Sequence, residues 1–164
     1  MITQIQAAES KNAKVWYEAE TGFICVVQVG QMEEADAILI MNTIESYLSN
    51  HLGRTEPYYI LVDIRKATGV SPSARRAFAD SRKASAAAQA NEGPRHIAIF
   101  GGSFAFRTFA NLLMSALRLA QLASFAKPDQ PGTQEWTVEA DEAAARDWLA
   151  GQRRIHLARS AKAA

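Results

Sequence analysis

The 164-residue chain has little cysteine and histidine, and this limits the chemistry it can support. Its one cysteine, Cys25, cannot form an internal disulfide and sits in an apolar run at residues 23–27, so we expect it to pack in the core. The three histidines show no His-x-x-x-His spacing, and a lone cysteine excludes a Cys-x-x-Cys pair, so the sequence predicts no metal site and no cofactor. A Gly-x-Ser-x-Gly nucleophile elbow is also absent. Catalysis is therefore not expected, unless residues distant in sequence assemble a site.

The chain also has almost no net charge. Lys and Arg total 18 against 17 Asp and Glu, which gives a formal charge of +1 at pH 7. Such a balance produces no field that selects nucleic acid or a charged membrane, although residues 153–162 are locally basic and are expected to be solvated. Residues 1–12 carry no basic segment followed by an apolar one, so the sequence predicts no secretion signal and a cytoplasmic location.

What the chain does have is an alternation of apolar strands and amphipathic helices, which is typical of crossover helices linking the strands of one sheet. Strands are predicted at residues 14–20, 23–29, 58–64, 95–100 and 133–138, and helices at 31–52, 71–90, 104–125 and 141–152. Thr21-Gly22 joins the first two strands into an antiparallel hairpin, whereas the later strands are expected to be parallel.

The predicted fold class is therefore α/β, with a mixed sheet of about five strands and about four helices. A length of 164 residues with 48% apolar composition suits a single domain with its own core. We place that domain at residues 14–150, with residues 1–13 and 151–164 as terminal extensions.

The predicted helix at residues 104–125 is apolar over more than half of its circumference. Arg107 and Arg118 lie in its polar stripe and argue against a membrane span. Neighbouring helices, a homodimer interface or a pocket for a small apolar ligand or lipid could each cover the remaining apolar surface. The sequence leaves these alternatives open.

A candidate partner or ligand surface follows the strand at residues 58–64. This strand is predicted to end in the carboxylate of Asp63, and a polar loop through residues 66–69 then leads to a helix entrance at Ser71-Pro72. Open α/β sheets bind ligands at the carboxyl ends of strands and beside helix amino termini. A serine before proline suits a helix start, because its hydroxyl accepts an N–H while proline has none to leave unpaired. The residues of this predicted surface are Asp63, Ser71, Ser73, Arg75 and Arg76.

The alternative role for Asp63 is local. Its carboxylate could accept hydrogen bonds from loop amides or pair with Arg65 or Lys66.

A second candidate is an anion site at the turn between the strand at 95–100 and the helix that follows. Gly101 and Gly102 allow backbone N–H groups to converge, Ser103 follows them, and Arg107 lies one helical turn further on. Two adjacent glycines match neither the Walker pattern nor the dinucleotide fingerprint. The alternative is therefore a plain turn in which Ser103 caps the next helix.

The order of these elements resembles the STAS domain, the fold of anti-sigma-factor antagonists, and more closely its SpoIIAA-like group of small bacterial domains. The resemblance rests on Leu61-Val62-Asp63, on the Ser-Pro helix entrance with paired arginines, and on residues 97–101 and 142–149, and it covers residues 14–150. It implies a non-catalytic regulatory domain of bacterial signalling that binds a protein partner. Because the group shares its architecture with CRAL-TRIO lipid carriers, it also implies an alternative, a carrier or sensor of a small apolar ligand or lipid beside the helix at 104–125.

The best-known device of this family is a serine that is phosphorylated within Asp-Ser-Ser-Gly at the start of the helix after the central strand. The corresponding position here falls near Ser73, although the aspartate and glycine of that pattern are absent. The helix dipole, Arg75 and Arg76 would favour a phosphate there. The resemblance thus implies phosphorylation of Ser73, and the alternative is an unmodified cap at Ser71 beside an exposed Ser73.

Overall fold

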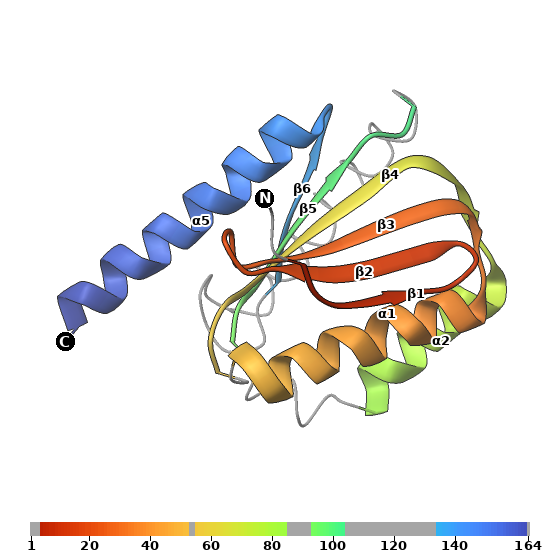
Figure 1. Cartoon of the computed structure of the whole chain (residues 1–164), viewed down its shortest axis with the longest axis horizontal. Helices are drawn as coiled ribbons and strands as arrows, with labels where there is room; N and C mark the ends of the chain where they lie inside the picture. The colour runs from red at the N-terminus through yellow and green to blue at the C-terminus, as the bar shows by residue number, and fades with distance from the viewer. Residues whose placement is uncertain (1–3, 53–54, 85–92, 104–133, 164) are drawn as a thin grey trace, which may run out of the picture.

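The computed structural model describes residues 4–52, 55–84, 93–103 and 134–163 (Figure 1). Six strands form one sheet in the order of the sequence, and their bounds are β1 (Gln4–Glu9), β2 (Ala13–Glu18), β3 (Phe23–Met32), β4 (Tyr58–Val70), β5 (Arg95–Phe100) and β6 (Gln134–Glu139). The pairs β1–β2 and β2–β3 are antiparallel, and the pairs from β3 to β6 are parallel. The predicted mixed α/β sheet is confirmed, with six strands rather than about five.

The additional strand is β1, which lies within residues that the sequence assigns to a terminal extension. It pairs antiparallel with β2, with a register shift between Ile5 and Ala8. Its residues are mostly polar or small, so their composition alone does not indicate a strand. The neighbouring strand supplies the hydrogen bonds that make this segment part of the sheet.

Three α-helices occur in the described ranges, α1 (Glu34–Tyr47), α2 (Pro72–Ala84) and α5 (Glu142–Ala163), and a π-helical turn, Leu48–Leu52, follows α1. About four helices were expected, and the predicted helix at 104–125 lies outside the described residues. The predicted homodimer interface, the apolar pocket beside that helix and Arg107 lie outside them as well. None of the described helices is long and apolar enough to cross a membrane.

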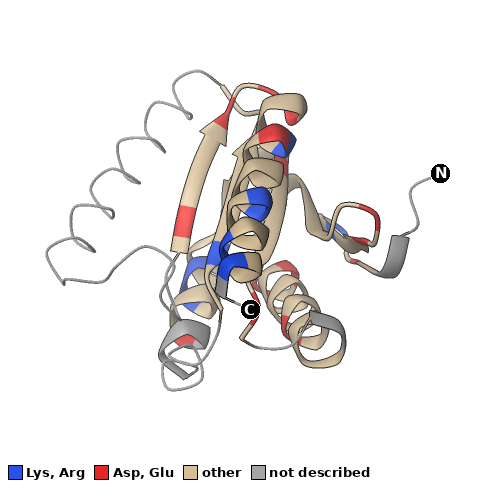
Figure 2. Ribbon diagram, turned by 90° about the vertical axis from the view of Figure 1, so that its left-hand side faces the viewer, with Lys and Arg blue, Asp and Glu red and all other residues tan. Residues whose placement is uncertain are grey.

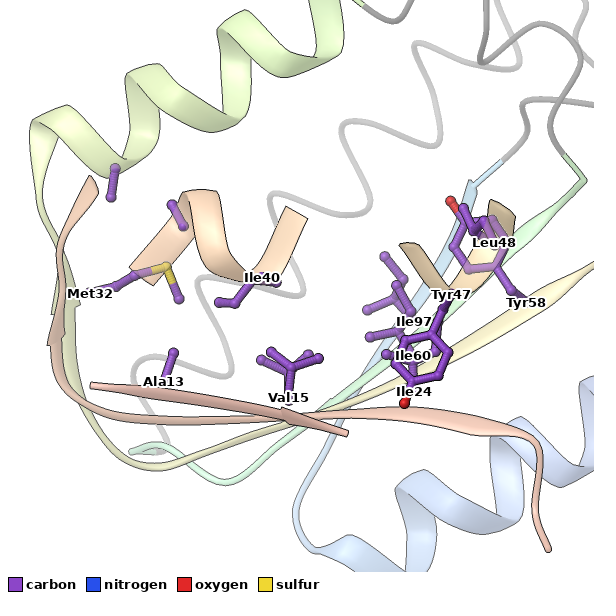
Figure 3. Close-up of a cluster of buried hydrophobic side chains, with 13 residues drawn as sticks. Ala13, Val15, Ile24, Met32, Ile40, Tyr47, Leu48, Tyr58, Ile60 and Ile97 are labelled. Atoms are coloured by element: carbon purple, nitrogen blue, oxygen red, sulfur yellow. The ribbon is translucent and has the colours of Figure 1, made fainter. Parts of the chain in front are cut away.

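The helices cover both faces of the sheet (Figure 1). On one face, α1 and α2 pack against the buried side chains of a first core, which include Val15, Ile24 and Ile60 (Figure 3). On the opposite face, Ala145 and Leu149 of α5 pack against a second core that contains Cys25. Cys25 is 2% exposed within this core, which confirms the packing role expected for it, and burial raises the pKa of its thiol well above its ordinary value.

Strands β3 and β4 are longer than predicted because they pair with each other beyond the end of β5. Their parallel register continues from Val29 opposite Lys66 to Met32 opposite Val70. The predicted loop at residues 66–69 and the predicted helix start at residue 31 are therefore wrong. Polar composition suggested a loop, whereas pairing with the neighbouring strand satisfies the backbone groups of this segment and makes it a strand.

The start of α1 is fastened to the turn between β1 and β2 through Asp36. Its carboxylate accepts hydrogen bonds from Ser10 Oγ at 2.6 Å, from Asn12 Nδ2 at 3.1 Å and from the backbone N–H of Glu33 at 2.8 Å. Burial acts to raise the pKa of Asp36, but these hydrogen bonds outweigh it and lower the pKa below its ordinary value. The β1–β2 turn is thus held against the first turn of α1.

Candidate partner-binding site

Asp63 lies within β4 and not at its end, which corrects the predicted strand boundary. Its partner across the sheet is Phe100, the last residue of β5, so Asp63 marks the point where β5 stops and β4 continues. The side chain of Asp63 lies on the face of the sheet that α5 covers, as its neighbours Tyr59 and Leu61 do. The carboxylate therefore lies where β5 ends beside the continuing β4, close to the amino terminus of α5.

The carboxylate of Asp63 binds Arg65 at three points. Asp63 Oδ1 accepts the Arg65 backbone N–H at 2.9 Å and Nε at 3.0 Å, and Oδ2 lies 2.6 Å from Nη2. Burial acts to raise the pKa of Asp63, but the hydrogen bonds and charge of Arg65 lower it below its ordinary value. The pairing of Asp63 with Arg65 that was considered as its alternative role is therefore confirmed. Both carboxylate oxygens of Asp63 already accept hydrogen bonds from Arg65.

Arg65 is the exposed member of this pair. Its side chain is 59% exposed, against 14% for that of Asp63. The guanidinium carbon lies 5.1 Å from the centroid of the Phe100 ring, and Nη2 lies 3.7 Å from Oε2 of Glu142 in α5. Arg65 is thus oriented by an aromatic ring and two carboxylates while it presents its outer surface to solvent.

The two glycines of the predicted anion site adjoin this arginine. Gly101 has φ of +91° and Gly102 has φ of +73°, a region that favours glycine. A Cβ at Gly101 would stand 2.5 Å from Arg65 Cγ and 2.9 Å from Arg65 N, so the backbone passes directly over Arg65. The glycines therefore serve close packing and a sharp turn after β5. Ser103 is exposed, and the anion site formed with Arg107 stays a prediction.

A surface depression of about 390 Å³ adjoins the same corner. Its lining residues come from the paired segments of β3 and β4, and they are Val27, Gln28, Val29, Asp63, Arg65 and Lys66. Val29 is 43% exposed, and Lys66 is also exposed. The arrangement combines two cationic side chains with an apolar floor, which suits a partner that offers a carboxylate or phosphate next to an apolar group. We call this set of six residues the β3–β4 corner.

The other residues of the predicted surface lie at the start of α2. Ser71 caps this helix as predicted, because its Oγ accepts the Ala74 N–H at 3.2 Å. Its own backbone N–H donates to the carbonyl of Met32 at 2.9 Å, which ties the helix start to the end of β3. Ser73 is half-buried, and its Oγ lies 3.0 Å from that of Ser71.

The structure therefore divides the predicted surface into two. Arg75 and Arg76 are exposed on α2, which packs with α1 on the face opposite α5. Asp63 points to the α5 face and contacts none of the α2 residues among its described partners. The two groups are separated because the Asp63 side chain lies on the face of the sheet that α5 covers, whereas α2 packs on the opposite face.

Sequence reasoning did not find the exposed cations and valines of the β3–β4 corner as binding residues. Arg65 and Lys66 were considered only as partners of Asp63, and Val27 and Val29 only as part of the strand predicted at residues 23–29. Composition gave no clear signal for them, because the part of β4 that extends past β5 contains Lys66, Ala67 and Gly69, residue types that are depleted in strands. The described residues contain no group of three or more His, Cys, Asp or Glu side chains placed to hold a metal.

Antiparallel first strands, parallel later strands and helices on both faces together define a STAS-type α/β domain. The sequence profile of the SpoIIAA-like family matches residues 23–150, and the chain belongs to this family. A similar solved structure is that of an uncharacterised protein of the DUF3478 family with a SpoIIAA-like fold, from Shewanella loihica PV-4. It is 22% identical, the match covers 90% of this chain and 93% of that one, and the TM-score is 0.46. No curated protein matches the chain.

Proposed function

We propose that this domain is a non-catalytic interaction module, and that a protein partner binds at the β3–β4 corner. The observation that carries the proposal is the oriented and exposed guanidinium of Arg65 at the rim of a depression with a partly apolar floor. Asp63 and Glu142 restrain Arg65 before a partner arrives, so less side-chain entropy is lost on binding. Family membership supports the same role, because STAS-type domains typically bind partners without transforming them.

No step of covalent chemistry is supported at this corner. Among the described lining residues, Asp63 is the only carboxylate and is paired with Arg65, and none is a serine, cysteine or histidine that could act as nucleophile or base. Hydrogen bonding and charge pairing by Arg65 and Lys66 remain, and both serve recognition. A location in the cytoplasm and a role in bacterial signalling stay predictions.

The proposal is tested by comparing the proteins that the chain captures from a bacterial lysate with those captured by two variants. The first variant, Val29→Asp with Lys66→Glu, changes the corner and leaves the Asp63–Arg65 pair intact. The matched control, Arg75→Glu with Arg76→Glu, reverses two exposed charges on α2. We expect the corner variant to lose a specific partner that the control retains, as measured by quantitative mass spectrometry. Equal capture by wild type and the corner variant would contradict the proposal.

Phosphorylation of Ser73 is a separate proposal, supported by its place in the first turn of α2 and by the two exposed arginines that follow. Intact mass measurement of the protein from its own host tests it. The carrier alternative depends on residues 104–125, which lie outside the described ranges, and no observation on the described residues favours it.

A further inference from the structure

The second half of α5 extends past the sheet. Figure 1 shows α5 running away from the strands, with the C-terminus clear of the other labelled elements. Its first half is anchored, because Ala145 and Leu149 are fully buried, whereas the side chains of residues 153–162 are all exposed except the half-buried His156. These ten residues make about 15 Å of helix. We call residues 153–162 the α5 arm.

The α5 arm has a positive net charge, whereas the rest of the chain has a negative one. Residues 151–164 contain four Lys or Arg and no Asp or Glu. Since the whole chain has 18 basic and 17 acidic residues, residues 1–150 hold 14 and 17, a net charge of −3. In Figure 2 the blue segments on the ribbon of α5 mark its Lys and Arg residues. The arm and the body of the protein therefore have opposite net charge.

One side of the arm combines charge with a contact surface of small and apolar groups. Arg154, Leu157, Ala158 and Ala161 recur at spacings of three and four, so they share one side of the helix, and Lys162 borders it. Leu157 is 55% exposed, the largest value among the exposed large apolar side chains of the described residues. Ile155 is also exposed but lies about 200° around the helix from Leu157. A helix that lies on a membrane gathers its apolar side chains on one face, which this arm does not.

Helix α1 offers a complementary surface. Its exposed stripe runs through Glu34, Ile38, Asn42 and Glu45, and no Lys or Arg occurs in the helix. Ile38 is 42% exposed in the middle of this stripe. Beside it, between α1 and β1, lies a depression of about 380 Å³, lined by Ala7, Ala8, Leu39, Asn42, Thr43 and Ser46. The stripe is acidic at both ends and apolar at its centre.

We propose that the α5 arm of one chain docks antiparallel on α1 of a second copy of this chain. Leu157 then faces Ile38, Lys162 approaches Glu34 and Arg154 approaches Glu45. The two basic positions are eight residues apart and the two acidic ones eleven, so they span about 12 and 16 Å of helix, a difference that long Lys and Arg side chains cover.

Within one chain the contact is not available, because α1 and α5 cover opposite faces of the sheet (Figure 1). A reciprocal exchange of arms gives a closed two-fold pair in which each arm meets the same surface of its partner. The opposite dipoles of antiparallel helices also favour this orientation, since the carboxyl end of α5 meets the amino end of α1.

The test is a charge exchange between the two surfaces, measured on purified protein by analytical ultracentrifugation across a concentration series. The arm variant carries Arg154→Glu and Lys162→Glu, and the α1 variant carries Glu34→Lys and Glu45→Lys. Each variant alone places like charges opposite each other, so we expect its self-association to weaken by about tenfold or more relative to wild type. An equimolar mixture of the two variants restores both contacts and is expected to associate as wild type does.

Further measurements can also refute the proposal. The control Arg75→Glu with Arg76→Glu on α2 should associate as wild type, and thermal unfolding should show that all variants are folded. Leu157→Ser alone should weaken association without changing charge. A wild-type chain that stays monomeric at every concentration in low salt overturns the proposal, as does a mixture that fails to restore association. Binding of the monomer to vesicles of phosphatidylserine without self-association would instead assign the arm to a membrane surface and overturn it.

Discussion

Removing the guanidinium of Arg146 should destabilise the protein strongly, because it leaves a buried carboxylate without its counter-charge. Glu18 in β2 has only 2% of its side chain exposed, and Arg146 in α5 binds it with two hydrogen bonds, Nη1 to Oε2 at 2.7 Å and Nη2 to Oε1 at 2.9 Å. Thr21 Oγ1 donates a third to the same carboxylate at 3.1 Å. Arg146 is in turn oriented by Glu142, whose Oε1 lies 2.8 Å from Nε.

The magnitude follows from the pKa of Glu18. The hydrogen bonds from Arg146, acting against burial, lower this pKa from 4.5 to about 2. At about 1.4 kcal/mol per pKa unit the difference corresponds to roughly 3 kcal/mol. This value lies at the lower end of the loss of stability, about 3 to 5 kcal/mol, that is typical when one partner of a buried ion pair is removed. We therefore expect Arg146→Met to lower the free energy of unfolding by about 3 kcal/mol, or the melting temperature by about 6 to 12 °C.

The sign of the pH dependence is fixed by the direction of the shift. Because the pKa of Glu18 is lower in the folded than in the unfolded chain, the stabilisation is complete above about pH 4.5 and is lost as the pH falls towards about 2. Wild type should therefore lose this contribution between these values. Arg146→Met should show a much weaker dependence on pH over the same interval.

Urea unfolding followed by tryptophan fluorescence measures these free energies, with Glu18→Gln and the double variant completing a double-mutant cycle. We expect the double variant to be more stable than Arg146→Met alone, because no buried charge is then left unpaired. A loss below about 1 kcal/mol for Arg146→Met, or strict additivity of the two single changes, would refute the account.

Three other substitutions, the last given with its matched control, have expected outcomes that thermal or urea unfolding can measure. Leu149→Ala removes a fully buried side chain beneath α5 and should cost about 2 to 5 kcal/mol. Ser71→Ala removes the cap of α2 and should cost about 1 kcal/mol. Gly101→Ala forces a Cβ within 3 Å of the Arg65 backbone at positive φ and should cost more than about 1 kcal/mol, whereas Gly151→Ala, with nothing within 4 Å, should stabilise α5 slightly.

Matched controls exist for the first two. Ile155→Ala shortens an exposed apolar side chain of similar size, on the side of the α5 arm away from Leu157, and should alter stability by less than about 0.5 kcal/mol. Ser73→Ala removes a hydroxyl from the first turn of α2 without removing the cap and should cost less than Ser71→Ala. If each control lowered the free energy of unfolding as much as its test substitution does, burial of Leu149 and capping by Ser71 would not explain the losses.

Much of the fold could be predicted because its signals are local. The hairpin at Thr21-Gly22 is confirmed, since Gly22 has φ of +74° and its N–H donates to the carbonyl of Glu18 at 2.8 Å. The strand at residues 95–100 and the cap at Ser71 are also confirmed, because apolar runs and capping residues act within a few positions. The candidate site was predicted less well, since only the pairing of Asp63 with its neighbour Arg65 depends on adjacent residues.

Tertiary structure decided what depends on strands that are far apart in the sequence. The amino-acid order by itself determined the mixed sheet, the helix entrance at Ser71 and the buried place of Cys25, because periodicity and turn chemistry are properties of short segments. The extension of β4 to Val70 depends on parallel pairing with β3, and the Glu18–Arg146 pair joins residues 128 positions apart. The separation of Asp63 from Arg75 and Arg76 depends on which face of the sheet each helix covers. Such relations arise only when the sheet assembles, because no local preference specifies a partner at long range.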